Sequence, residues 1–318
     1  MDILAGLNVE DLETLDADLA DLVASLGPAV VPEKPPQFIG ASEIACILGL
    51  HHYLSPYKLW AQLHGLIPRY GGGNAQTLRG QIMEPSLRDW YAKKLGVNMY
   101  NGPTFEGEPW TRKDTPWQAA RPDGCWMTPE GTYLLEVKTT LSWDGWGPEG
   151  TDQIPSDYAC QIIWQQWVAS DRGPVAGSHL IAFNRYNDEI RVYLMPPRLD
   201  LGRALAARAE TWWAAHIVGM EPPMLDGTEA TREALKGQHR RDIRPELEAT
   251  PERVALVEAY RVAAKAAAEA DLAKELARNR LVAEIGEARG ITGLCTYKLQ
   301  RTAGDGMTRA LHLKAKKP

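Results

Sequence analysis

The sequence predicts a mixed α/β fold of the α+β kind, in which a central mixed sheet is flanked by helices and followed by a helical arm and a terminal hairpin. The apolar stretch 132–140 is typical of a strand, and 178–184 and 189–195 also predict strands. The stretches 77–95 and 157–168 have apolar residues at helical spacing. Strands interspersed with amphipathic helices indicate a sheet that helices cover.

The length and composition of the chain limit the classes of protein to which it can belong. The 318 residues fit one large domain or two modest domains, and 44% apolar residues with eleven Trp suffice for a sizeable core. We find no run of 18 apolar residues and no signal segment, so we expect a cytoplasmic protein that does not span a membrane. The four Cys are scattered without a Cys-x-x-Cys pair, which favours reduced thiols over a disulfide framework or a zinc site.

Charge and proline content divide the chain into three predicted regions. Residues 1–37 carry eight acids and one Lys, and we expect an amphipathic helix over 9–26 and then a Pro-rich linker. This helix packs on its own domain, docks another protein, or covers a basic groove. Residues 38–225 should form the globular domain. Residues 226–318 carry 14 acids and 18 bases and predict a helical arm, 251–289, before a basic hairpin. Local charge decides where a polyanion binds, so the net charge of −6 does not exclude nucleic acid.

A pair of carboxylates is predicted beside the strand at 132–140. If the Pro-Asp-Gly segment around Asp123 pairs with this strand as a hairpin, Asp123 comes beside Glu136. Residues i and i+2 of a strand share a face, so Lys138 points the same way as Glu136. Adjacent carboxylates repel unless a divalent cation lies between them, and Mg²⁺ prefers such oxygen ligands. A neighbouring Lys can orient or deprotonate a water, or stabilise charge on a phosphate.

The spacing Pro-Asp-x12-Glu-Val-Lys is the PD-(D/E)xK pattern of metal-dependent nucleases. An isolated match also fits a surface hairpin with a Glu–Lys pair, so its interpretation depends on other segments.

Three further segments offer candidate functional side chains, each with a structural alternative. Ser42 is expected to cap a helix N-terminus, and the same geometry can bind a phosphate. Glu84 is either a solvated helix residue or points into the metal site, with Gly80 permitting close approach. The loop at 141–155 carries Trp143 and Trp146, which either pack within the loop or stack on a base.

Five short motifs occur in order along the chain. They are Gly-Ala-Ser42-Glu-Ile-Ala, Gly80-x-x-x-Glu84, Pro-Asp123-Gly, Glu136-Val-Lys138 and Tyr158-x-x-Gln161-x-x-x-Gln165. In this combination the chain resembles the YqaJ-type viral recombinase family, the group that includes phage lambda exonuclease, over roughly residues 38–225. The resemblance implies a restriction-endonuclease-like core. It also implies an exonuclease that degrades duplex DNA from its ends, 5′ to 3′, and leaves 3′ overhangs for an annealing protein.

The resemblance also implies residue roles. Asp123, Glu136 and the backbone carbonyl of Val137 would bind Mg²⁺, with Mn²⁺ as an alternative ion and two ions per site. Glu84 would hold the second ion or its waters. Lys138 would position and activate the attacking water, and Gln161 would orient that water or Lys138. Relatives form rings of three or four subunits, so a homo-oligomer is expected by analogy alone.

Contacts with DNA follow from the resemblance and from charge. Ser42 falls where relatives contact the terminal 5′ phosphate. Relatives often have an Arg shortly before this position, where this chain has Pro-Pro-Gln, so Arg79 or Arg121 is the candidate replacement. In the C-terminal hairpin, Lys298 and Arg301 belong to a group of bases that either contacts the DNA backbone or is simply solvated.

Two other functions stay open at this point. The first is a structure-specific endonuclease or a RecB-like nuclease with an Fe–S cluster, although the Cys spacing fits no cluster motif. The second is a DNA-binding module without activity, against which the complete set of Asp123, Glu136 and Lys138 argues.

Overall fold

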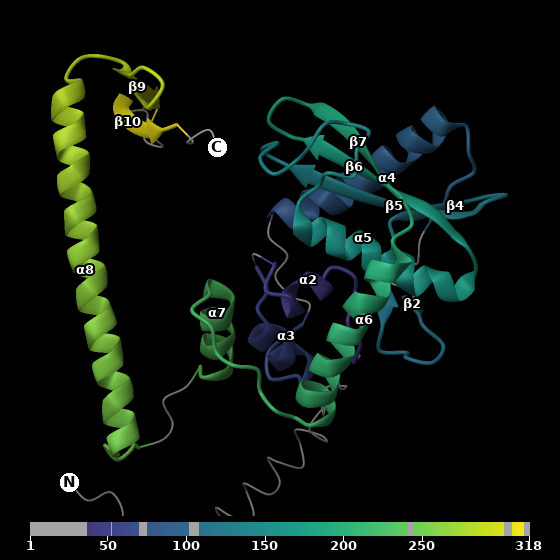
Figure 1. Ribbon diagram of the computed structural model, residues 1–318, viewed down its shortest axis with the longest axis horizontal. Helices are drawn as coiled ribbons and strands as arrows, with labels where there is room; N and C mark the ends of the chain where they lie inside the picture. Colours follow the sequence, from purple (N-terminus) through teal and green to yellow (C-terminus); the bar gives the residue numbers. More distant parts are fainter. Residues whose placement is uncertain are drawn as a thin grey trace, which may run out of the picture. The chain divides into compact units, whose positions relative to one another are not determined.

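The computed structural model describes residues 37–51, 53–69, 75–101, 108–240, 245–301 and 307–314 (Figure 1). The chain divides into two compact units, Met1–Arg241 and Asp242–Pro318. The helix expected at 9–26 lies outside the described residues. The domain boundary expected after residue 225 stays a prediction. None of the described helices is both long and apolar enough to cross a membrane.

A five-stranded sheet forms the centre of the first unit. Strands β5 and β6 are parallel and the other neighbours are antiparallel, which confirms the predicted mixed sheet. β4 and β5 form the hairpin that was expected around Asp123, although β1 was not predicted. The order is β1 (Tyr100–Asn101), β4 (Gly124–Thr128), β5 (Gly131–Thr140), β6 (Val175–Asn184) and β7 (Glu189–Met195).

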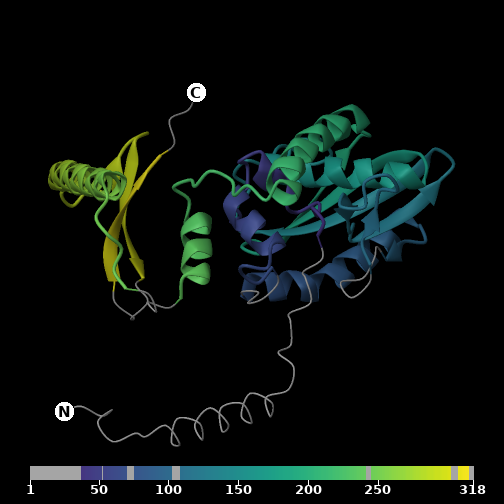
Figure 2. The same ribbon diagram turned by 90° about the horizontal axis from the view of Figure 1, so that it is seen from below.

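Helices cover both faces of this sheet, as the sequence predicts (Figure 2). On one face, Tyr91 of α4 (Ala75–Leu95) packs with Leu135 and Ile181. On the other face, Ile162 of α5 (Ser156–Ala169) packs with Leu180. The period-two alternation of β5 and β6 decides which side chains face which helix.

Helix α6 (Leu199–Trp213), which continues into a π-helical turn over Ala214–Val218, packs on α5. Gly202 allows the close approach, because a Cβ there would lie 2.8 Å from the Cβ of Trp167. This second layer is joined by three shorter helices, α2 (Ile44–Ile47), α3 (Pro56–Leu63) and α7 (Glu229–Gln238), and by the two-stranded pair β2 (Trp110–Thr111) and β3 (Ala119–Ala120).

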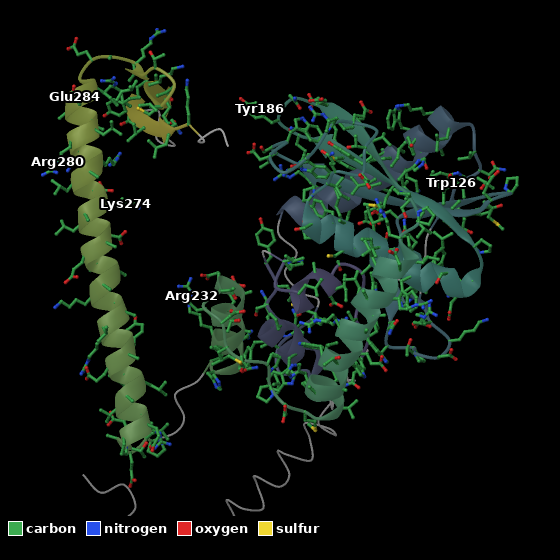
Figure 3. All side chains as sticks on the ribbon, viewed as in Figure 1. Trp126, Tyr186, Arg232, Lys274, Arg280 and Glu284 are labelled. Atoms are coloured by element: carbon green, nitrogen blue, oxygen red, sulfur yellow. The ribbon has the colours of Figure 1, made fainter. Side chains whose placement is uncertain are left out.

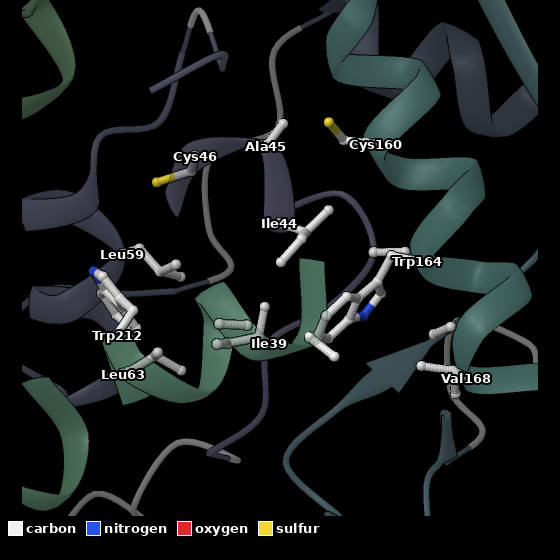
Figure 4. Packing of buried hydrophobic residues seen from close by; sticks show 14 of the residues in the cluster. Ile39, Ile44, Ala45, Cys46, Leu59, Leu63, Cys160, Trp164, Val168 and Trp212 are labelled. Atoms are coloured by element: carbon white, nitrogen blue, oxygen red, sulfur yellow. The ribbon is translucent and has the colours of Figure 1, made fainter. Parts of the chain in front are cut away.

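The largest core cluster lies between α2, α3, α5 and α6 (Figure 4). Ile39, Ile44, Leu59 and Trp164 are each 0% exposed there. Ser55, which precedes Pro56, caps α3 by accepting a hydrogen bond from the Lys58 N–H. This packing ties the segment that precedes the sheet to the helix that covers it.

The second unit consists of α8 (Pro251–Ile285) and a small antiparallel sheet of β8 (Gly290–Ile291), β9 (Cys295–Arg301) and β10 (Met307–Leu313). The helix and the β9–β10 hairpin match the predicted arm and hairpin, and β8 was not predicted. The side chains of Lys274, Arg280 and Glu284 project from the C-terminal part of α8 (Figure 3). Only Ile285 of its 35 residues is buried.

Candidate active site

The β4–β5 register places the predicted carboxylates side by side. Gly124 pairs with Leu135, and the Asp123 N–H donates to the Leu135 carbonyl at 2.9 Å, so Asp123 comes opposite Glu136. The Asp123 carboxylate in turn accepts a hydrogen bond of 2.7 Å from the Val137 N–H. The Pro-Asp-Gly segment is therefore fixed to β5 through the backbone on both sides of Glu136.

Glu136 is a buried carboxylate, and both of its oxygens accept hydrogen bonds. Its side chain is 3% exposed, and Lys138 Nζ lies 2.5 Å from Oε1. Two amides of α5 complete the set, because Gln161 Nε2 donates to Oε1 at 2.5 Å and Gln165 Nε2 donates to Oε2 at 2.7 Å. A buried charge needs such partners. The spacing of four residues puts both amides on one helix face, toward Glu136.

Asp123 lacks comparable compensation. Burial raises its pKa well above the ordinary value for an aspartate, and the charges of Glu136 and Glu84 raise it further. Lys138 and the hydrogen bond from Val137 act in the opposite direction without cancelling the rise. Negative charge is thus concentrated around Asp123, as the sequence predicts for adjacent carboxylates.

Lys138 is held as an ammonium group. Burial by itself lowers its pKa, but the charges of Glu136 and Asp123 outweigh burial and raise the pKa. Its Nζ also lies 5.3 Å from the centre of the Tyr158 ring, at a distance where a cation and an aromatic face attract. In this arrangement Lys138 presents a fixed positive charge beside the carboxylates.

Glu84 belongs to the same electrostatic group although it comes from α4. Burial and the charge of Glu136 raise its pKa, whereas Arg88 and Lys138 lower it. Among the described residues, a Cβ at Gly80 would meet nothing within 4 Å, and the close approach that Gly80 was expected to permit stays a prediction.

Arg88 is a site residue that the sequence reasoning missed. Its guanidinium donates to the Asp123 carbonyl at 3.2 Å and lies 3.8 Å from the Glu84 carboxylate, with its side chain 14% exposed. A Cβ at Gly124 would lie 3.3 Å from Arg88 Cδ, so this glycine leaves room for the Arg stem. The spacing of four residues after Glu84 was the available signal.

The donor chemistry fits a hard divalent cation only in part. Asp123 and Glu136 are neighbouring carboxylates, and the buried Gln165 Oε1 accepts no hydrogen bond from any described residue, which leaves a spare oxygen beside Glu136. Within the described ranges, however, no three His, Cys, Asp or Glu side chains converge as a cluster that could hold a metal ion. Glu84 therefore does not complete a three-carboxylate cage in this conformation.

A pocket of about 400 Å³ adjoins the carboxylates. Gln161 lines it and also donates to Glu136, so the pocket and the carboxylate cluster share a wall. Ser42 and Arg121, two of the predicted DNA contacts, line it as well. Ser42 does not cap α2, contrary to the prediction, because it lies in a turn and Glu43 occupies the N-cap position. The Ser42 side chain is thus not committed to a cap.

The remaining candidates lie elsewhere. Arg79 is exposed on α4 and is not among the described residues that line the pocket. Lys298 is exposed on β9 of the second unit, and Arg301 ends the same strand. Their roles as DNA contacts stay predictions.

The tryptophans of the 141–155 loop pack within the first unit. Trp143 Nε1 donates to Glu189 at 2.8 Å, and the Arg191 guanidinium lies 4.0 Å from its ring centre. The Trp146 ring centre lies 5.1 Å from that of Tyr193. These contacts agree with the alternative in which Trp143 and Trp146 pack within the protein.

Part of the chain is similar to a known protein family. The family model of the YqaJ-like viral recombinase domain matches residues 34–172. No curated protein matches the chain. Among solved structures, the alkaline exonuclease LHK-Exo from Laribacter hongkongensis is 17% identical, with 63% of this chain and 94% of that chain covered and a TM-score of 0.42. For LHK-Exo in complex with dAMP, the identity is 20%, the coverage 63% and 92%, and the TM-score 0.43.

Proposed function

We propose that the protein is a metal-dependent deoxyribonuclease, because its residues 34–172 match the family model of the YqaJ-like viral recombinase domain. It would hydrolyse duplex DNA from its ends, 5′ to 3′, and leave 3′ overhangs that an annealing protein uses in phage-type recombination. The single observation that supports this best is the register that brings Asp123, Glu136 and Lys138 together on adjoining strands.

The proposed metal ligands are Asp123, Glu136 and the Val137 carbonyl, with Glu84 serving a second ion or its waters. When bound, Mg²⁺ or Mn²⁺ supplies charge that polarises the scissile phosphate and lowers the pKa of a water. The chain's own part is to hold the carboxylates in place. Gln161 and Gln165 fix both oxygens of Glu136, and Val137 fixes Asp123.

Lys138 would act on the reacting phosphate and the attacking water. Its raised pKa keeps it protonated at neutral pH, so it stabilises negative charge that develops on the phosphate. A protonated Lys also positions a water through its N–H groups without taking a proton from it. Transfer of that proton to Lys138 would require the neighbouring carboxylate charge to be neutralised first.

The pocket beside the carboxylates would receive the terminal phosphate of the strand that is degraded. Ser42 offers a hydroxyl, Arg121 a guanidinium and Gln161 an amide on its walls. Such groups bind phosphate oxygens through charge-assisted hydrogen bonds. An end held in this pocket would place the adjacent phosphodiester at the carboxylates.

The test uses linear duplex DNA labelled at one 5′ or one 3′ end, with Mg²⁺ or EDTA. The wild-type protein should release the 5′ label early as a mononucleotide, and EDTA should abolish release. Lys138→Ala should lose at least about a hundredfold in rate, since it removes electrostatic stabilisation from the transition state. Lys236→Ala is the matched control, because Lys236 is exposed on α7.

The other outcomes decide against specific parts of the proposal. Internal cuts would indicate an endonuclease. Early release of the 3′ label would reverse the polarity. Binding to DNA without cleavage under Mg²⁺ or Mn²⁺ would indicate a module that has lost activity and would overturn the catalytic assignments.

A further inference from the structure

A buried ion pair stands behind one wall of the pocket. The Arg69 guanidinium binds both oxygens of Glu43, at 3.1 Å from Nε to Oε1 and at 2.7 Å from Nη2 to Oε2. The Arg69 side chain is 2% exposed and that of Glu43 is 11% exposed. Bidentate pairs of this kind are the strongest and most directional ones that side chains form.

The same ion pair organises the segment that carries Ser42. Arg69 Nη2 also donates to the Phe38 carbonyl at 2.5 Å, and the guanidinium lies 4.3 Å from the Phe38 ring centre. Glu43 Oε2 accepts a hydrogen bond of 2.7 Å from the Gly40 N–H. Arg69, which follows α3 in the chain, thereby fixes the turn from Phe38 to Glu43 that lines the pocket.

Arg69 compensates part of the negative charge of the pocket lining. Two carboxylates, Glu43 and Glu108, line the pocket against one guanidinium, Arg121. Without a further cation the lining would be acidic and would repel a phosphate. Arg69 does not line the pocket among the described residues, yet it neutralises the Glu43 carboxylate from behind. In a partly desolvated wall, one uncompensated charge has a large effect on an anionic ligand.

We propose that the Arg69–Glu43 ion pair sets the specificity of the pocket for a phosphorylated DNA end, with Arg69 as a positioning residue that cancels the Glu43 charge and fixes the turn bearing Ser42. This inference rests on the proposed function, since it takes the pocket as the site for a terminal phosphate. It adds that a residue outside the pocket lining determines whether that phosphate is accepted.

The experiment measures equilibrium binding in EDTA, so that it does not depend on cleavage. Fluorescence anisotropy compares full-length protein on two duplexes that differ only in a 5′ phosphate or a 5′ hydroxyl. The wild type should prefer the phosphate by about tenfold or more, the effect of a charge-assisted hydrogen bond. Arg69→Gln should reduce that preference to within about twofold of none, because the Glu43 charge is then exposed to the ligand.

Two further variants separate charge from architecture. Glu43→Gln with Arg69→Gln removes both charges and should restore the preference to within about threefold of wild type. Glu43→Gln alone leaves the Arg69 charge in excess and should raise the preference above that of wild type by about threefold. Lys58→Gln is the matched control, because it removes a more exposed ion pair, with Glu233, and should change nothing.

Three results would contradict the inference. No phosphate preference in the wild type, a preserved preference in Arg69→Gln, or a double variant as impaired as Arg69→Gln would overturn the inference. If Arg69→Gln fails to fold, Glu43→Gln alone still tests the idea, and an unchanged preference in that variant would overturn it. Cleavage with Mg²⁺ in the same wild-type preparation reports the proposed function separately. A preference for the 5′ phosphate without cleavage would support this inference and contradict the proposed nuclease activity. Cleavage without a phosphate preference would support the nuclease activity and contradict this inference.

Discussion

Helices α5 and α8 bury very different shares of their residues. Nine of the 14 residues of α5 are buried, among them Gln161, Gln165 and Gln166, whereas α8 buries only Ile285. The buried amides of α5 all donate hydrogen bonds, two of them to Glu136. Burying polar groups is costly unless each finds a partner, so polar residues in a core helix point to function.

The charges of α8, in contrast, form pairs with one another on the surface. Arg261 with Glu258 and Arg278 with Glu275 are spaced three residues apart and are more than half exposed. Such pairs add little to stability. Packing therefore supports α5 and the site beneath it, while local propensity supports α8.

Trp164→Ala should lower the free energy of unfolding of the first unit by about 3–5 kcal/mol, the usual cost of a large core truncation. Trp164 is 0% exposed, and its Nε1 donates to the Ala119 carbonyl at 2.9 Å. Urea unfolding followed by Trp fluorescence measures this unit alone, because all eleven Trp precede residue 241. The counterpart on α8 is Leu272→Ala, at a residue 73% exposed, which should lower the stability of the second unit by less than about 0.5 kcal/mol. Amide exchange in α8 measures that unit, which contains no Trp. Equal effects would contradict the contrast.

Arg88→Met should reduce nuclease activity about 10- to 100-fold with little change in unfolding, because it removes a hydrogen bond to the Asp123 carbonyl and a charge near Glu84. Methionine keeps most of the apolar stem that passes over Gly124. Rates on end-labelled duplex at fixed Mg²⁺ give the measurement. Lys93→Met, an exposed change on the same helix, is the control. Activity within twofold of wild type would remove Arg88 from the site.

His179 should make the first unit less stable in acid. Burial lowers the pKa of His179 to about 4, from an ordinary value of 6.5, and the Tyr91 hydroxyl that faces it has a pKa raised to about 12 and stays neutral. The unfolded chain therefore takes up a proton between pH 6.5 and 4 while the folded protein does not. The stability is fully present above pH 6.5 and is lost as the pH falls toward 4.

The measurement is urea unfolding of wild type and His179→Gln at several pH values from 4 to 8. Between pH 7 and pH 4 the wild type should lose on the order of 1–2 kcal/mol more than the variant, after allowance for solvent screening of a partly exposed ring. Parallel pH profiles would show that His179 is not the group responsible. Its contacts with Trp126 and Tyr133 place it in the core beneath α4.

Arg309→Gln should weaken the attachment of the C-terminal hairpin to the end of α8 by about 1 kcal/mol. Its guanidinium donates to the carbonyls of Gly286 and Ala288 beyond the helix, and at 3.1 Å to that of Tyr297. Faster amide exchange in β9 and β10, with no change in α5, is the expected result. Arg261→Ala on the exposed part of α8 is the matched control and should alter exchange by less than about 0.5 kcal/mol. Unchanged amide exchange in Arg309→Gln would show that β9 and β10 are stable without the contacts of Arg309.

Local patterns determined much of this protein. The period-two alternation of β5 predicts that Glu136 and Lys138 share a face, and the Pro-Asp-Gly segment predicts the hairpin that brings Asp123 alongside. The helical spacing of Gln161 and Gln165 predicts one polar face. These features depend on residues close together in sequence, for which backbone geometry alone decides which side chains meet.

Tertiary structure decided the rest. The Ser42 cap was wrong because Glu43 takes the N-cap position of α2. Glu43, the ion-pair partner of Arg69, lies 26 positions away in the sequence, and the Asp123 carbonyl that Arg88 reaches lies 35 positions away. No periodicity encodes such distances. Which charge lies behind a pocket wall depends on how separate elements pack, because a buried charge takes whichever partner the packing brings within reach.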